Sequence, residues 1–262
     1  MAGFQPLDAI KIDLAHTLDQ LTGRYQSMRD GLPELVKNSK DHYARLGVAE
    51  RQQRQIVVIF SENRRHLGVL DFGGAVTEDF DGWVEWSSRT ASRAELASDI
   101  EAGNGNGGKA FMVRGCLTVA FMCGHSLGKR TQMGFRNDDP QLRYRAGYFT
   151  DDQGAVIRDL PDLDPHCRLS QMLSPFGLSA KDLPQAARGA FEARRAYTLV
   201  ILRDVSELAA SPQRAQVVDA AITDLCGHPQ AAMTIELGLP ISIGLQSSCG
   251  PSSVPTRLLV RR

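Results

Sequence analysis

Apolar residues recur at helical spacing along the first fifth of the chain. In residues 10–21 and 24–47 they return every three or four positions, which predicts amphipathic helices. Gly31 and Pro33 interrupt the second pattern. Because proline is tolerated in the first turn of a helix, we expect a new helix from roughly Glu34 to Leu46.

Shorter apolar runs predict strands. Residues 55–60 (QIVVIF) and 66–72 (HLGVLDF) read as two strands joined by a polar turn. The β-branched run 196–205 (AYTLVILRDV) predicts another strand, and 234–245 predicts a further strand or hairpin.

Between these runs the pattern changes twice. The apolar stretch AFMVRGCLTVAFM follows Lys109 without a proline and predicts a helix that opens there. Strands and hairpins are expected from Cys123 to Ile157, with a turn at 151–154, and a helix near 213–226.

Composition is that of an ordinary globular protein. The 262 residues are 42% hydrophobic and 23% charged, and 30 basic side chains balance 30 acidic ones. No net field therefore attracts nucleic acid or anionic membrane. Five cysteines do not suggest a disulfide framework and indicate a reducing cytoplasm. Cys116, Cys123 and Cys167 are interpreted as buried small hydrophobes rather than metal ligands. No apolar run reaches membrane-spanning length, so no membrane association is expected.

A glycine-rich run, GNGNGGKA at 103–110, permits two interpretations. Alternating Gly and Asn is typical of a flexible linker. Glycines that lead into a helix instead point free N–H groups at one spot, where the helix dipole favours an anion. The run lacks the Ser or Thr that follows the lysine of a Walker A loop, so by itself it decides neither.

A second candidate lies on the helix after Pro33. Spacings of four and three place Glu34, Asn38 and Asp41 on one helical face. Two carboxylates and an amide oxygen suit a hydrated hard cation and a base for water. The alternative is the polar face of an amphipathic helix that meets solvent.

A third candidate is the end of the strand in GVLDFGGAV. The strand stops at Asp71, and Gly73 and Gly74 then allow a close approach to the backbone. An acid in that setting can accept a hydrogen bond from an exocyclic amine. A turn with a solvated aspartate is the alternative.

In this order and spacing, the three segments resemble the GHKL ATPase superfamily, which includes gyrase B, MutL, MORC proteins, heat-shock chaperones and histidine kinases. ELVKNSKD (34–41) is similar to its N-box, DFGGA (71–75) to its adenine-binding box, and GNGNGGKAF (103–111) to its ATP-lid box. The resemblance implies the Bergerat fold: a two-layer α+β sandwich with a mixed, mostly antiparallel sheet and helices on one face. The resemblance runs from about residue 20 to residue 205, within an expected ATP-binding domain at 1–235. Residues 236–262 are expected to form a C-terminal strand and a Ser-, Pro- and Gly-rich tail, which would lead to a further domain in a longer chain.

The resemblance also implies a role for each segment. Glu34 would be the general base, Asn38 would hold Mg²⁺, and Asp71 would accept from the adenine amino group. A later threonine usually joins the aspartate to adenine through water; Thr198 is chosen here, with Thr234 as the rival. The implied nucleotide-binding set is Asn38, Asp41, Asp71, Gly73, Gly103, Gly105, Asn106, Gly107, Gly108, Lys109, Ala110 and Thr198.

The expected function is therefore an Mg-dependent ATPase that acts as a lid and homodimerisation switch, with ATP and Mg²⁺ as cofactors and a protein or DNA client that the sequence does not identify. The alternatives are a nucleotide-binding module that does not hydrolyse and a histidine-kinase-like phosphotransferase. Three positions depart from the family pattern: Ala75 replaces the last glycine of the adenine box, His42 an alanine, and Tyr197 a glycine.

Overall fold

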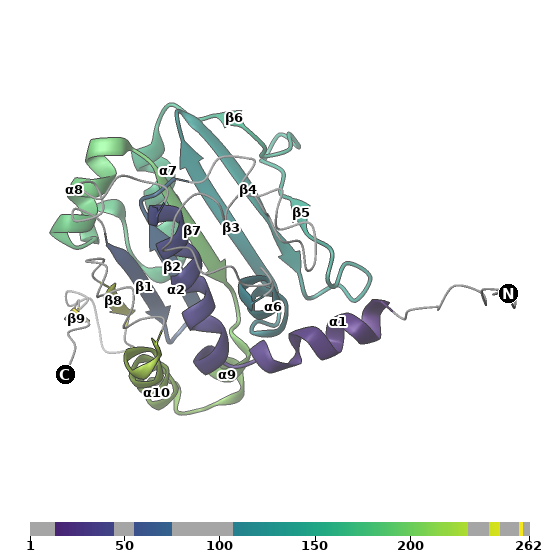
Figure 1. Ribbon diagram of the computed structural model, residues 1–262. Coiled ribbons are helices and arrows are strands. Elements are labelled where there is room, and N and C mark those ends of the chain that lie inside the picture. Colours follow the sequence, from purple (N-terminus) through teal and green to yellow (C-terminus); the bar gives the residue numbers. More distant parts are fainter. Residues whose placement is uncertain (1–13, 45–54, 75–106, 230–240, 247–256, 259–262) are drawn as a thin grey trace, which may run out of the picture.

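One open sheet organises the molecule. The structure is a computed structural model, which describes residues 14–44, 55–74, 107–229, 241–246 and 257–258. In these residues nine strands form a sheet in the order β5-β4-β3-β7-β2-β1-β8-β9, with β6 beside β4 (Figure 1). Its paired strands are antiparallel except for β1 and β8. The strands are β1 Ile56–Ser61, β2 His66–Asp71, β3 Val119–Ser126, β4 Lys129–Arg136, β5 Gly147–Tyr148, β6 Leu160–Pro161, β7 Tyr197–Leu202, β8 Ile241–Gln246 and β9 Arg257–Leu258.

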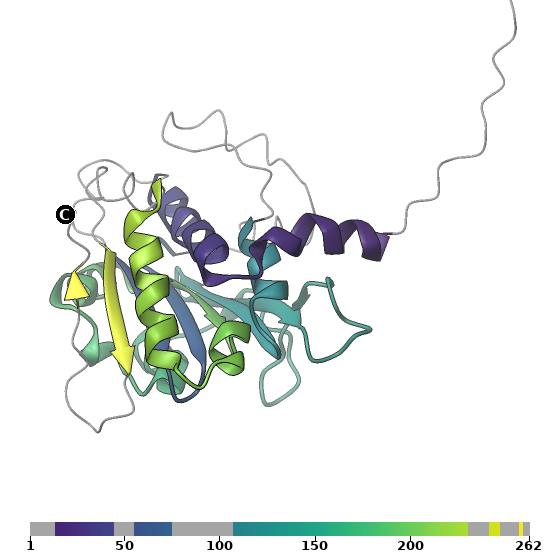
Figure 2. The ribbon, with the colours of Figure 1, turned by 90° about the horizontal axis from the view of Figure 1, so that it is seen from below.

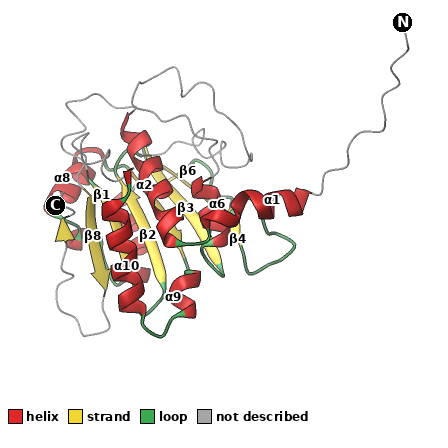
Figure 3. Cartoon of the chain, turned by 60° about the horizontal axis from the view of Figure 1, so that its bottom comes forward, coloured by secondary structure: helices red, strands yellow, loops and turns green. Residues whose placement is uncertain are grey.

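The main helical layer covers one face of this sheet. Helices α2, α6 and α10 lie across that face, and α1 extends beyond its edge (Figures 1 and 3). The predicted α+β sandwich with a mixed, mostly antiparallel sheet is confirmed. The helices of this layer are α1 Leu14–Thr22, α2 Met28–Ala44, α6 Gly107–Arg114, α9 Ser206–Ala210 and α10 Arg214–Gly227.

The opposite face of the sheet also carries helices, which the prediction of helices on one face did not include. Alternate residues of β1 enter separate cores: Val58 packs with α2, α6 and α10, whereas Val57 and Ile59 pack with α7 (Pro165–Leu173), α8 (Gln185–Arg194) and the turns between them. Strands with apolar residues at successive positions are covered on both faces. The second layer lies beneath the sheet in Figure 2.

Helix α2 begins six residues before the predicted start at Glu34. Ser27 supplies the start signal, since its hydroxyl lies 2.7 Å from the Asp30 carboxylate and 3.3 Å from the Asp30 N–H. The first free N–H, that of Met28, donates to Glu207 at 2.8 Å. Pro33 therefore lies inside the helix rather than in its first turn. Capping and tertiary contacts outweigh the helix-breaking signal of proline here.

The helix predicted from Lys109 onward is shorter than expected. Helix α6 ends at Arg114, and the rest of that apolar run becomes strand β3. Gly115 follows the last helical residue, and Asn137 donates to the carbonyl oxygens of Met112 and Cys116 at 2.8 and 3.2 Å. These bonds satisfy carbonyl groups that a helix end leaves free.

The strands predicted at 55–60, 66–72 and 196–205 correspond to β1, β2 and β7, and the predicted helix at 213–226 corresponds to α10. Strand β8, on the C-terminal side of residue 235, pairs with β1 and so belongs to the same sheet. In the part of the chain that the structure describes, no helix has the length and apolar character needed to cross a membrane.

Candidate functional site

Helices α2 and α6 pack together through glycines. A Cβ atom added to Gly31 would lie 2.1 Å from the Phe111 ring, and one added to Gly107 would lie 2.4 Å from Glu34 Oε2. Both distances are far below a van der Waals contact. Gly31 is needed for this close approach because a Cβ atom there would overlap Phe111, whereas at Gly107 the flexible end of Glu34 would have to move aside. Two segments that are far apart in sequence, the ELVKNSKD helix and the end of the glycine-rich run, are thus in direct contact.

This contact places a carboxylate at the start of a helix. Glu34 is partly buried, and its side chain lies against Gly107, the first residue of α6. The first N–H groups of a helix have no intrahelical partner and carry the positive end of the helix dipole. The same end of α6 would attract a phosphate group, so a carboxylate and a helix end suited to an anion share one location.

Asp71 and Thr198 form a second part of the site. They are opposite each other in the antiparallel pair of β2 and β7, and each is 1% exposed. The Thr198 Oγ1 atom has no hydrogen-bond partner among the described residues. Because buried polar groups are nearly always bonded, this hydroxyl indicates a position for a water or a ligand atom beside Asp71.

The chain turns sharply after Asp71. The N–H of Gly73 donates to Asp71 Oδ1 at 2.9 Å, which fixes the carboxylate at the strand end. Gly74 has φ of 70°, and a Cβ atom there would lie 2.8 Å from the Ala196 Cβ. A larger residue at position 74 would therefore be strained as well as crowded.

A buried tyrosine joins these parts, and the sequence reasoning missed it. The Tyr43 hydroxyl donates to the Gln55 carbonyl oxygen at 2.7 Å and accepts from the Phe72 N–H at 2.7 Å. Tyr43 lies in the last turn of α2, the helix of Glu34 and Asn38, whereas Phe72 directly follows Asp71. Its sequence signal is an aromatic residue that follows the polar stripe of the helix.

The predicted site residues are brought together in part. Glu34 and Asn38 are one turn apart on α2, both partly buried, and Gly107, Gly108, Lys109 and Ala110 form the buried first turn of α6. Asp71, Gly73 and Thr198 surround the end of β2. Gly103, Gly105, Asn106 and the rival Thr234 lie outside the described residues, as does the side chain of Asp41.

The residues present are compatible with a nucleotide and Mg²⁺. The Thr198 hydroxyl, which has no hydrogen-bond partner among the described residues, lies beside the buried carboxylate of Asp71. This pair suits a nucleobase with an exocyclic amine. Among the described residues, no three His, Cys, Asp or Glu side chains form a metal cluster. Mg²⁺ in nucleotide sites takes few protein ligands and completes its shell with phosphate oxygens and water, and the partly buried Asn38 offers one amide oxygen for such a site.

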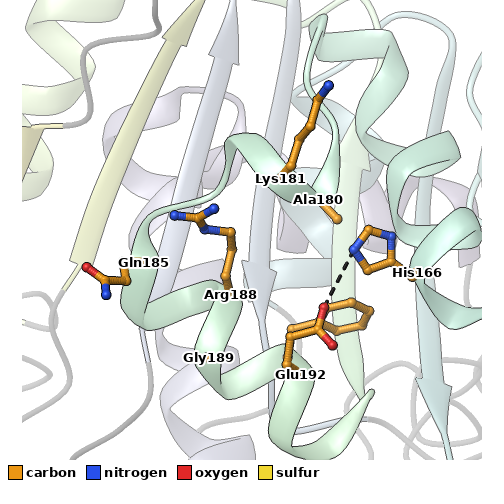
Figure 4. A pocket seen from close by; sticks show the side chains of 8 residues that line it. His166, Ala180, Lys181, Gln185, Arg188, Gly189 and Glu192 are labelled. Atoms are coloured by element: carbon orange, nitrogen blue, oxygen red, sulfur yellow. Dashed lines mark ion pairs between the residues drawn. The ribbon is translucent and has the colours of Figure 1, made fainter.

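A pocket of about 400 Å³ lies apart from this site, in the second helical layer (Figure 4). His166 pairs with Glu192 there at 3.5 Å, and the side chains of Lys181 and Arg188 extend away from that pair. The charged groups do not converge on one point, so the pocket lacks the arrangement that a specific polar site requires. Its lining residues are His166, Ala180, Lys181, Gln185, Arg188, Gly189, Phe191 and Glu192.

Comparison with protein-family models and with curated proteins finds no match to this chain.

Proposed function

We propose that this chain is an Mg-dependent ATPase of the GHKL type. The observation that carries the proposal is the contact of Glu34 with Gly107, which brings a carboxylate to the start of the helix that follows the glycine-rich run. The buried pair of Asp71 and Thr198 supports it, since this pair would offer an adenine ring a carboxylate and a hydroxyl that has no hydrogen-bond partner among the described residues.

Each group would have a defined task. Asp71 would accept a hydrogen bond from the exocyclic amine of adenine, and Thr198 would reach the ring through a water molecule. The N–H groups of the first turn of α6, with buried Lys109, would bind the phosphates. Glu34 would take a proton from the attacking water. The water oxygen would bond to the terminal phosphorus while the bond from that phosphorus to the bridging oxygen breaks and ADP leaves.

Asn38 would contribute its amide oxygen to Mg²⁺ at the same site. When bound, the ion supplies neutralisation of the phosphate charge. Asn38 lies one helical turn from Glu34, so the residue that holds the metal and the residue that activates water belong to one rigid element.

The proposal extends to a nucleotide-dependent homodimer that would act as a conformational switch. A non-hydrolysing nucleotide-binding module would use the same adenine contacts without Glu34 as a base. Phosphate release separates the two functions, since only the ATPase produces it.

The decisive variant is Glu34→Ala. It should bind Mg·ATP like the parent protein, since the adenine contacts and α6 are unchanged, and lose hydrolysis by about 10²–10⁴-fold, the usual effect of removing a general base. Phosphate release and calorimetric affinity measure the two effects separately. Asn38→Ala should also weaken the metal-dependent part of binding. Light scattering should show that Glu34→Ala accumulates as an ATP-bound dimer.

Asp71→Asn is the companion variant. Removal of the charge that accepts the adenine amine should cost about 1.5–3 kcal/mol of binding free energy, with the fold intact by circular dichroism. Unaltered ATP affinity in Asp71→Asn, or hydrolysis at the parent rate in Glu34→Ala, would contradict the proposed roles.

A further inference from the structure

The Tyr43 hydroxyl stands where two strands separate. The paired register of β1 and β2 ends at Val57 opposite Leu70. Continued by two positions, the same register would place Gln55 opposite Phe72. In a regular antiparallel ladder, every second pair of opposite residues bonds directly through its N–H and C=O groups. Here the hydroxyl lies between the Phe72 N–H and the Gln55 oxygen, 2.7 Å from each.

The position of this bridge makes it relevant to Asp71. Asp71 is fixed on one side by its pairing with Thr198 and is followed directly by Phe72, whose N–H the hydroxyl holds. Tyr43 and Phe72 are both fully buried. A bridge in a tightly packed interior transmits displacement, because its neighbours leave no room for independent movement.

The other end of this connection is the helix that carries the proposed base. Tyr43 belongs to α2, nine residues after Glu34, and the helix between them is continuous. A shift of α2 therefore moves the hydroxyl, and a shift of the chain after Asp71 moves α2.

We infer that Tyr43 is a positioning residue that couples adenine recognition at Asp71 to the placement of Glu34 and Asn38. The inference rests on the proposed ATPase function and adds to it a residue outside the three sequence boxes. Its hydroxyl sets the position of the chain after Asp71, and so the strength of the bond between Asp71 and the adenine amine.

The test compares ATP with inosine triphosphate, which has no exocyclic amine. Tyr43→Phe keeps the buried ring and removes the hydroxyl. Its ATP affinity should fall about tenfold, the equivalent of one good hydrogen bond, while its affinity for inosine triphosphate changes little. The ratio of the two affinities, measured by calorimetry, should therefore approach unity, as in Asp71→Asn. If the role of Tyr43 were purely structural, Tyr43→Phe would lower the affinities for both nucleotides by the same factor.

Tyr197→Phe is the matched control. It also removes a hydroxyl from a fully buried tyrosine. The Tyr197 hydroxyl lies 3.8 Å from Cys123 Sγ, in the core between the sheet and helices α7 and α8. It should keep the parent ratio. If Tyr43→Phe does not fold by circular dichroism, Tyr43→Met repeats the test with an adaptable side chain that also lacks the hydroxyl.

The outcomes distinguish a failure of the role of Tyr43 from a failure of the ATPase function. If a folded Tyr43 variant keeps the parent protein's ratio of ATP affinity to inosine triphosphate affinity, this inference is overturned and the ATPase proposal is left intact. A parent protein that does not bind ATP overturns the proposed function and this inference together.

Discussion

Thr198 illustrates how a single buried atom can carry functional information. Its hydroxyl lies in the sheet interior, opposite Asp71, without a hydrogen-bond partner among the described residues. A desolvated hydroxyl that bonds to nothing lowers stability, since the protein loses the bond to water without replacement. Its presence is explained if a ligand or an ordered water supplies the missing bond.

Thr198→Val should accordingly separate stability from binding. The free energy of unfolding should stay the same or rise by about 1 kcal/mol, because an unbonded buried polar group is replaced by an apolar one of similar shape. ATP affinity should fall by a comparable free energy, since the water-mediated contact is lost. Chemical denaturation and calorimetry measure the two changes. A loss of stability without a loss of affinity would show that the hydroxyl has a purely structural bond.

At the scale of elements, the packing of α2 on α6 decides the geometry of the site. Helix axes that approach through glycines lie closer than those separated by larger side chains. Gly31 faces Phe111 and Gly107 faces Glu34, so the contact runs along the helix that carries the proposed base. Gly31 lies inside α2, so a turn does not explain it, and Gly107 is the first residue of α6.

Gly107→Ala should leave the fold intact and reduce hydrolysis. The added methyl group would meet the flexible end of Glu34, which can move aside but then leaves the start of α6. We expect ATP hydrolysis to fall by at least about tenfold, since a small misplacement of a catalytic group has effects of that size or larger. Phosphate release and thermal unfolding are the measurements.

Gly189→Ala is the matched control within α8. A Cβ atom there meets nothing within 4 Å, so the change should stabilise the helix by about 0.5–1 kcal/mol and leave hydrolysis unchanged. Equal effects of the two alanines on hydrolysis would contradict a specific role for the Glu34–Gly107 contact.

At the scale of the whole molecule, the sheet has a core on each face. Cys116 belongs to the core beneath α2 and α6, and Cys123 belongs to the core beneath α7 and α8. Burial raises the pKa of the Cys116 thiol to about 12 and that of the Cys123 thiol to about 11. Cys167 and Cys226 are exposed, so the interpretation as a buried hydrophobe is wrong for Cys167.

Thiol labelling should therefore report the integrity of both cores. Cys249 lies outside the described residues, so a Cys249→Ser variant is used. At pH 8 a disulfide reagent should modify Cys167 and Cys226 rapidly, while Cys116 and Cys123 should react only when the protein unfolds, because they are buried and protonated. Rapid reaction of four thiols in the native protein would contradict the two-core arrangement.

The sequence by itself determined the elements whose signals are local. The β-branched runs gave β1, β2 and β7, and the helical periodicity gave α2 and α10, since these patterns depend on neighbouring residues. The spacing of Glu34 and Asn38 on one helical face also follows from the sequence alone. The end of α6 at Arg114 was missed because strand β3 continues the same apolar run, and apolar character alone does not separate a buried helix from a buried strand.

Only the tertiary structure decided which distant residues meet. Strand order placed Thr198 opposite Asp71, and helix packing placed Glu34 against Gly107. The bridge of Tyr43 to Phe72 and Gln55 likewise depends on three segments that converge in space. These contacts have no local signal, because the free energy that selects them comes from burial and close packing of the whole sheet and its two helical layers.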